Sequence, residues 1–159
     1  MRKSGVTRDR TVALLLERPE DFLPALWACL LGGITVCPPV PLRSDPQRRA
    51  ARLGLVDTLL DGPLLVTDAP TREELPAVRD LSVVTLEDLA PDDTGTATDA
   101  GPGTVPLAPA APDDVALLVL TSGSTSAAKA VRLTHGNLLA SMAAKAGTQS
   151  LTSREAHSR

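Results

Sequence analysis

The sequence predicts an α/β protein with a mostly parallel sheet flanked by helices. Short runs of β-forming residues alternate along the chain with segments whose apolar residues recur at helical spacing. One run, Val115–Leu120, is apolar without interruption, which is typical of a strand buried in a parallel sheet. A chain of 159 residues with 43% hydrophobic residues is also long and apolar enough to form a real core.

The first half of the chain is predicted to alternate strand and helix. We expect Asp21 to cap the first helix, which would place Pro24 in the first turn, where a backbone N–H has no partner in any case. Trp27 is expected on the buried face of that helix, beside Leu23, Leu26 and Leu30. The predicted elements are a strand at Thr11–Leu16, a helix at Asp21–Leu31 ended by Gly32-Gly33, a strand at Ile34–Cys37, a helix from Asp45-Pro46 to Gly62 with Ala50, Leu53, Val56 and Leu60 inward, and a strand at Leu64–Thr67.

The middle of the chain is less regular. Thr71-x-x-Glu74 is a capping-box pattern for a short helix, which Pro76 would cut short. Ser82–Thr85 is predicted as a strand and Leu86–Ala90 as one helical turn. Residues 91–113 are built from Pro, Gly, Thr, Ala and Asp, which predicts a linker or long surface loop. The longer segment Asp80–Ala128 has eight acidic residues and no Lys or Arg, but it has no recognisable metal-ligand spacing, so an acidic, solvated loop is favoured over a metal site.

The ends of the chain are polar. We expect residues 1–10 to be disordered and residues 148–159 to be a polar tail, which leaves residues 11–147 as the folded part. The segment Phe22–Leu42 contains no charge, a pattern found both in membrane spans and in a buried helix-turn-strand. Its Gly-Gly pair, its prolines and its acidic flank favour the buried unit, so no membrane association is expected.

Composition argues against several classes of function. Phe22 and Trp27 are the only aromatic residues and the net charge is −3, so the chain lacks both stacking platforms and a basic surface for nucleic acid. Cys29 and Cys37 lack metal-ligand spacing and follow no signal peptide, which indicates reduced thiols in the cytoplasm.

The strongest functional signal is a hydroxyl-rich turn after the strand Val115–Leu120. Its residues are Thr121, Ser122, Gly123, Ser124, Thr125 and Ser126, and Lys129 follows. Glycine lets backbone N–H groups approach a ligand, and consecutive N–H groups in a tight turn bind anions. Hydroxyls and a lysine add further phosphate contacts. A solvent-exposed Ser/Thr turn is the plain alternative.

Two better-known phosphate loops fit this sequence poorly. A Walker loop needs a glycine directly before its lysine, where this chain has Ala128. The dinucleotide fingerprint is absent as well, because Gly101-Pro102-Gly103 has Pro106 in place of the third glycine and no strand before it. After Lys129 the chain is predicted to return in a short strand, Val131–Thr134. A helix opened by Gly136 follows, with an apolar face formed by Leu138, Leu139, Met142, Ala143 and Ala146.

This stretch resembles the phosphate loop of the adenylate-forming superfamily. The family signature runs Thr/Ser-Ser-Gly-Ser/Thr-Thr-Gly-x-Pro-Lys-Gly, followed by a strand and Thr-His-x-Asn. The matching residues are Thr121, Ser122, Gly123, Ser124, Thr125, Lys129, Thr134, His135 and Asn137. The chain departs from the signature at Ser126 and Ala130, where glycine is usual, and at Ala128, where proline is usual. Residues 9–42 resemble the early strand-helix-strand of the same superfamily, most of all its fatty acyl-AMP ligase-like loading domains for polyketide and nonribosomal peptide assembly lines.

The resemblance implies a ligase that activates a carboxylic acid with ATP to give an acyl-adenylate and pyrophosphate. The acyl group then passes to a thiol on coenzyme A or a carrier protein. The implied ATP-binding residues are Thr121, Ser122, Gly123, Ser124, Thr125 and Lys129. Mg²⁺ is expected with ATP, but no residue of this chain is assigned to metal binding or to catalysis. His135 is expected to cap or pack at a helix start.

The resemblance covers only the early part of a longer enzyme. We therefore expect a partial N-terminal domain that is inactive by itself. Three interpretations stay open: a truncated ligase that carries its phosphate loop, a nucleotide- or phosphate-binding module without catalysis, and an interaction piece that completes an enzyme encoded on a neighbouring chain. The acyl substrate cannot be assigned.

Overall fold

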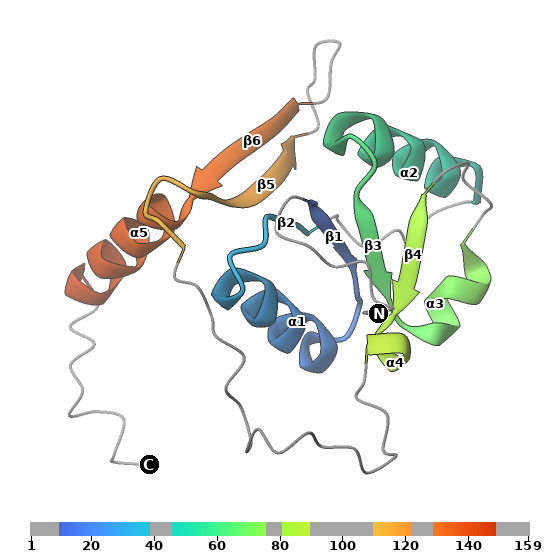
Figure 1. The fold of residues 1–159 in the computed structure, drawn as a ribbon, viewed down its shortest axis with the longest axis horizontal. Helices are drawn as coiled ribbons and strands as arrows, with labels where there is room; N and C mark the ends of the chain where they lie inside the picture. The colour runs from blue at the N-terminus through green and yellow to red at the C-terminus, as the bar shows by residue number, and fades with distance from the viewer. Residues whose placement is uncertain (1–9, 39–45, 76–80, 90–109, 122–128, 149–159) are drawn as a thin grey trace.

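The computed structural model describes residues 10–38, 46–75, 81–89, 110–121 and 129–148, and in these ranges the chain forms an α/β structure (Figure 1). Five strands run parallel and a sixth runs antiparallel at one edge, in the order β4-β3-β1-β2-β5-β6. The elements are β1 (Val12–Leu15), α1 (Pro19–Leu31), β2 (Val36–Cys37), α2 (Pro46–Leu60), β3 (Leu64–Thr67), α3 (Ala69–Glu74), β4 (Ser82–Thr85), α4 (Leu86–Leu89), β5 (Val115–Thr121), β6 (Lys129–Thr134) and α5 (His135–Thr148). The predicted fold class is confirmed. The expected disordered start, polar tail and most of the linker lie outside the described residues.

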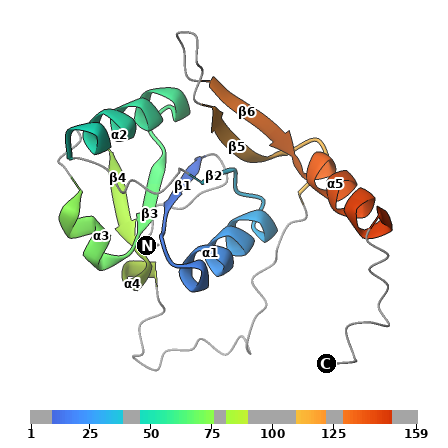
Figure 2. The ribbon, with the colours of Figure 1, turned by 180° about the vertical axis from the view of Figure 1, so that it is seen from behind.

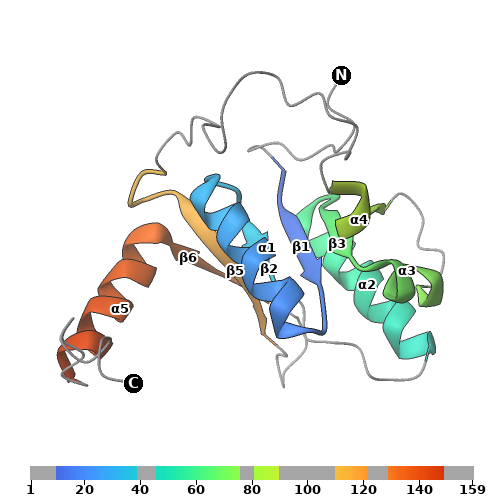
Figure 3. The ribbon, with the colours of Figure 1, turned by 90° about the horizontal axis from the view of Figure 1, so that it is seen from below.

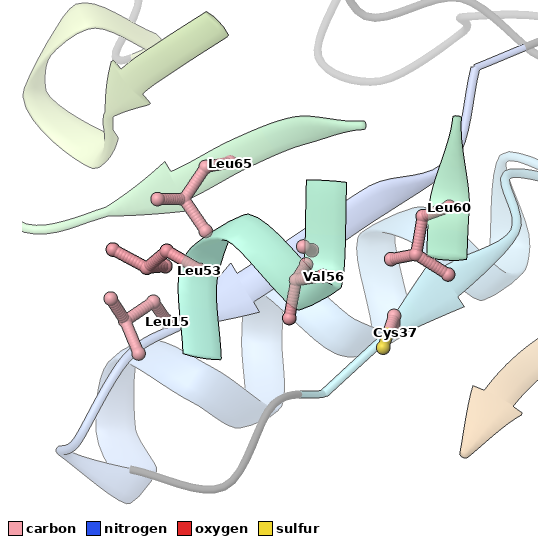
Figure 4. Packing of buried hydrophobic residues seen from close by; sticks show 7 residues of the cluster. Leu15, Cys37, Leu53, Val56, Leu60 and Leu65 are labelled. Atoms are coloured by element: carbon pink, nitrogen blue, oxygen red, sulfur yellow. The ribbon is translucent and has the colours of Figure 1, made fainter. Parts of the chain in front are cut away.

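The two faces of the sheet carry separate hydrophobic clusters, because successive side chains of a strand point to opposite faces. The cluster beneath α2 joins strand residues to the inner face of that helix, namely Ala13, Leu15, Cys37, Leu53, Val56, Leu60 and Leu65 (Figure 4). The cluster beneath α1 contains Val12, Leu14, Val36 and Val66, with Phe22, Ala25, Leu26 and Cys29 of α1 packed against it. We call these two faces of the sheet the α2 side and the α1 side.

Helix α1 begins earlier than the sequence predicted. Its first residue is Pro19, which needs no N–H partner there, and Arg18 precedes it. Asp21 does not cap the helix, because its carboxylate accepts a hydrogen bond from Arg18 Nε at 2.7 Å and forms an ion pair with that guanidinium. Pro24 therefore lies inside the helix rather than in its first turn. The predicted end is correct: Gly32 N–H donates to the Ala28 carbonyl, and Gly33 takes the left-handed φ of 65° that favours glycine.

The predicted burial of Trp27 is wrong. Trp27 and Leu23 are each 50% exposed, although Leu26 on the same helix packs against the α1-side cluster. Residues four apart share a helix face, so Leu23 and Trp27 lie together on the outer face, away from the sheet. The helix is apolar on both faces, which is why the sequence alone misassigned the inner one.

The other elements up to α4 are present as predicted, with differences at their ends. Strands β1 and β2 are both shorter than expected, and α3 is capped by Asp68, whose carboxylate accepts from Thr71 N–H at 2.8 Å. The Thr71-x-x-Glu74 pattern is therefore not the capping box of α3. A capping box does begin α4: Thr85 N–H donates to Asp88 at 3.0 Å, and Asp88 N–H donates to the Thr85 hydroxyl at 3.2 Å. Hydrogen bonds from the backbone N–H and the hydroxyl of Thr85 to the Asp88 carboxylate hold the pKa of Asp88 below its usual value.

The elements after residue 110 are more exposed than predicted. In β5 only Ala116 is buried, so the expectation of a buried strand holds for its position between β2 and β6 but not for its side chains. Helix α5 lies beyond the β6 edge of the sheet, whereas α3 and α4 lie near the β4 edge (Figures 2 and 3). Its predicted apolar face is uncovered, with Leu139 63% and Met142 56% exposed. Within the described ranges, no helix has the length and hydrophobicity needed to cross a membrane.

Candidate functional site

Strands β5 and β6 form an antiparallel hairpin that holds the two ends of the predicted phosphate loop together. Thr121, the last residue of β5, is paired with Lys129, the first residue of β6. The Thr121 hydroxyl donates to the Lys129 main-chain carbonyl at 3.2 Å. Both side chains are exposed. The last residue of β5 and the first residue of β6 are therefore neighbours in the sheet.

The alternation of side chains places Thr121 and Lys129 on the α1 side of the sheet. Leu117 packs against the α1-side cluster, and residues 119 and 121 follow it at the two-residue period of a strand. Directly paired residues of antiparallel strands point to the same face, so Lys129 shares the face of Thr121. A hydroxyl and an ammonium group thus stand side by side on one face, a pair that suits an anionic ligand.

The other predicted site residues, Ser122, Gly123, Ser124 and Thr125, lie outside the described residues. The structure brings together Thr121 and Lys129 and says nothing of the positions between them. The predicted anion-binding turn as a whole stays a prediction.

The Thr-His-x-Asn part of the motif has a structural explanation. Thr134 N–H donates to the Asn137 side-chain oxygen at 3.1 Å, and Asn137 N–H donates back to the Thr134 hydroxyl at 3.2 Å. This reciprocal pair satisfies two backbone donors at the start of α5, as a capping box does. The helix begins at His135, one residue before the predicted Gly136. Thr134 and Asn137 fix the direction of α5 after the hairpin.

The turn before β5 also forms backbone hydrogen bonds with the first residues of α5. His135 N–H donates to the Asp114 carbonyl at 3.0 Å, and Gly136 N–H donates to the Pro112 carbonyl at 2.8 Å. A Cβ at Gly136 would lie 3.1 Å from that carbonyl oxygen, a tight contact, so the close approach favours glycine. The His135 ring lies partly buried, with its Nε2 buried and without a hydrogen-bond partner among the described residues. These contacts agree with the expected packing role of His135.

A second feature that the sequence did not single out is a crevice of about 490 Å³ at the carboxyl ends of β1 and β3. Connections leave β1 and β3 in opposite directions along the sheet, and such a switch point is the usual ligand crevice of open α/β sheets. Its side chains carry both signs of charge, and Arg49 and Glu74 form an ion pair at 3.2 Å across it. The lining residues are Leu15, Glu17, Arg18, Arg49, Asp68, Pro70, Thr71, Glu74, Leu75 and Glu87. Only the strand order could have indicated this crevice, and strand order is not readable from one sequence.

The two cysteines are free thiols. Burial raises the pKa of Cys29 and of Cys37 to about 11, so both are protonated and weakly nucleophilic at neutral pH. Among the described residues, no three His, Cys, Asp or Glu side chains are grouped so as to hold a metal ion.

Comparison with known proteins extends these observations. A family model described as AMP-binding enzyme matches residues 1–157. Atromentin synthetase invA5 of Paxillus involutus is 31% identical over 153 residues, which is 96% of this chain and 15% of that protein. The chain thus spans about 15% of the length of the curated relatives that it matches first.

Solved structures contain the same fold. The structure of McyG A-PCP complexed with phenylalanyl-adenylate matches with a TM-score of 0.76 and 30% identity, covering 93% of this chain and 23% of that chain. The fatty acyl-adenylate ligase from L. pneumophila, in complex with acyl adenylate and pyrophosphate, matches with a TM-score of 0.63 and 22% identity over 87% of this chain and 23% of that chain, which shows the fold alone. The resemblance carried by Thr121–Lys129 and Thr134–Asn137 is confirmed. The chain belongs to the AMP-binding enzyme family.

Proposed function

We propose that the chain supplies the ATP phosphate-binding segment of an adenylate-forming ligase of the nonribosomal peptide synthetase type. In that reaction a carboxylate oxygen attacks the α-phosphorus of ATP, pyrophosphate leaves, and the acyl group of the acyl-adenylate then passes to a thiol of coenzyme A or a carrier protein. The observation that carries the proposal is the pairing of Thr121 with Lys129, where β5 ends and β6 begins.

The chemistry of the available groups supports a polyphosphate ligand. Lys129 supplies a positive charge and Thr121 a hydroxyl on the same side of the sheet, at the two ends of a segment rich in serine and threonine. A charge-assisted hydrogen bond to phosphate is about twice as strong as a neutral one. Ser122, Gly123, Ser124 and Thr125 would complete the cradle in this proposal. Mg²⁺ would arrive as the companion of ATP, and we assign none of this chain's residues to it.

The test is a titration of the chain with ATP, read by calorimetry. Removing one charge-assisted contact costs about 1.5–3 kcal/mol, so Lys129→Ala should weaken binding about 10- to 100-fold. Lys145→Ala is the matched control, because Lys145 is an exposed lysine in the last turn of α5. Equal affinity of the wild-type and Lys129→Ala chains would refute the assignment of the phosphate site.

A second experiment separates binding from catalysis. We expect the 159-residue chain alone to give no carboxylate-dependent ATP–pyrophosphate exchange. Holding the carboxylate near the α-phosphorus can contribute about 7–11 kcal/mol, and the proposal assigns no residue of this chain to that task. Exchange above background from a monodisperse chain would show that this expectation is wrong.

The exposed apolar surfaces of α1 and α5 favour a second candidate, an interaction piece that completes an enzyme on another chain. A nucleotide-binding module without catalysis is the remaining alternative, and the ATP titration tests it directly. We propose a cytoplasmic location, in which the thiols of Cys29 and Cys37 would stay reduced.

A further inference from the structure

The crevice at the carboxyl ends of β1 and β3 is separate from the phosphate loop. Its volume of about 490 Å³ lies within the range of small-molecule sites, which is about 300–1,000 Å³. Helices α1, α3 and α4 start soon after β1, β3 and β4 end, and residues at these helix starts line the crevice (Figure 1). Strand β2 separates β1 from β5, so β1 lies about 10 Å along the sheet from the strand that ends at Thr121.

Both arginines of the crevice are already paired with carboxylates. Arg18 donates from Nε to the Asp21 carboxylate at 2.7 Å and forms an ion pair with it. Arg49 forms an ion pair with Glu74 at 3.2 Å. Each positive charge on the wall is therefore balanced by a neighbouring negative charge, and a ligand anion would have to compete with that carboxylate.

The remaining carboxylates of the crevice leave an excess of negative charge. Asp68 accepts a hydrogen bond from Thr71 N–H at 2.8 Å, as the cap of α3. Glu17 and Glu87 line the same crevice, and neither forms an ion pair or a side-chain hydrogen bond with another residue in the described part of the chain. Two carboxylates at the rim of a concave surface attract a cation.

The crevice also offers apolar surface, which decides the kind of cation. Leu15, Pro70 and Leu75 belong to its lining. A bare metal ion gains nothing from apolar contacts, and the described residues contain no group of three His, Cys, Asp or Glu side chains that could hold one. An organic ammonium ion suits both parts of the lining, because it has three N–H donors on one end and a hydrocarbon group on the other.

We propose that this crevice binds a small organic cation, a primary ammonium ion that carries a hydrocarbon group. The ammonium group donates hydrogen bonds to the carboxylates of Glu17 and Glu87, and the hydrocarbon group packs against Leu15 and Leu75. This site goes beyond the phosphate-binding function proposed above, since none of its lining residues belongs to the segment 121–129.

The test is a titration of the full chain with n-hexylammonium chloride at neutral pH, read by ligand-observed NMR. Sodium hexanoate and 1-hexanol are the matched probes, with the same carbon chain but a negative charge or none. We expect saturable binding of hexylammonium and at least about tenfold weaker binding of the other two, the effect of losing a charge-assisted hydrogen bond. Added salt should weaken the binding of hexylammonium, because it screens exposed charges.

Variants test the two carboxylates. The double variant Glu17→Gln/Glu87→Gln keeps the size of both side chains and removes both charges, so it should bind hexylammonium at least about tenfold more weakly. Glu73→Gln is the matched control, because Glu73 is an exposed glutamate of α3 that does not line the crevice. Its affinity for hexylammonium should equal that of the wild-type chain. All three glutamates are exposed, and circular dichroism checks that the variants stay folded.

Several outcomes would overturn the inference. The absence of saturable hexylammonium binding would do so, as would wild-type affinity in the Glu17→Gln/Glu87→Gln variant. Hexanoate that binds as tightly as hexylammonium would show that the arginines of the crevice select an anion, and hexanol that binds as tightly would show that charge plays no part. Displacement of hexylammonium by Ca²⁺ would assign the two carboxylates to a metal ion.

Discussion

Helices α1 and α2 cover opposite faces of one sheet, but they differ in how deeply their inner residues are buried and in the polarity of their outer faces. Helix α2 buries Leu53, Val56 and Leu60 and turns exposed residues such as Arg48 and Thr58 outward. Helix α1 has no fully buried residue and is apolar on both faces. The comparison teaches that two helices on one sheet can differ in their outer faces: α2 presents polar residues to solvent, whereas α1 presents the apolar residues Leu23, Trp27 and Leu31.

The largest expected effect lies under α2. Leu53 is 1% exposed and packs in the α2-side cluster, so Leu53→Ala should lower the free energy of unfolding by about 2–5 kcal/mol. Urea denaturation of the full chain measures it. Thr58→Ala on the exposed face of the same helix should change stability by less than about 0.5 kcal/mol. A similar decrease in the free energy of unfolding for the two variants would contradict the assignment of a buried and an exposed face to α2.

A pH effect sharpens the comparison, because Cys37 lies in the cluster beneath α2. Burial raises the pKa of its thiol from 9.0 to about 11, so as pH rises the unfolded chain loses this proton first. The contribution of Cys37 to stability is therefore full below pH 9 and is lost as pH rises to about 11, amounting to about 2–3 kcal/mol at 1.36 kcal/mol per pH unit. Denaturation between pH 8 and 11 measures it.

Cys37→Ala is the control for this titration. It retains Cys29 but lacks the buried thiol of Cys37, so its stability should fall less over the same pH range. Parallel pH profiles for the two proteins would show that the Cys37 thiol is not shielded from water as its burial requires.

A smaller effect than that of Leu53→Ala is expected on the outer face of α1. A fully buried tryptophan would cost about 3–5 kcal/mol on truncation, but half-exposed Trp27 should cost about 1 kcal/mol or less as Trp27→Ala. Leu26→Ala, on the inner face, should cost more. The fluorescence maximum of Trp27 should also lie near that of solvent-exposed indole. A blue-shifted maximum in the monomer would show that α1 is already covered.

Much of the fold was predictable because local signals agreed with the tertiary structure. Strands β3 and β4 have the predicted bounds, since each is a short β-forming run between turn residues. The end of α1 was predictable from Gly32-Gly33, because glycine readily adopts the left-handed conformation that ends a helix. The start of α1 was not, because the ion pair with Arg18 removes Asp21 from the capping role.

Burial was the least predictable property. Periodicity identifies an apolar face but not whether another layer covers it, which is why Trp27 was wrongly assigned to the core and why the exposure of the apolar face of α5 was not predicted. In the candidate site, the return of the chain beside β5 was predictable from two short β-forming runs, although β6 begins at Lys129, two residues before the predicted Val131. The capping role of Thr134 and Asn137 was hidden within a family motif, although Thr-x-x-Asn resembles the local pattern of a capping box.

The β5–β6 hairpin has a consequence for the order of folding. The bond from Thr121 to Lys129 spans 8 residues, whereas the bond from Thr35, the residue before β2, to Val115 in β5 spans 80. By the logarithmic dependence of loop entropy on length, the longer closure costs about 2 kcal/mol more. We therefore expect the hairpin to form before it attaches to the parallel strands. Pulse-labelled hydrogen exchange would protect the amides of β6 before those of β2 if the chain follows this order, and the reverse sequence of protection would contradict it.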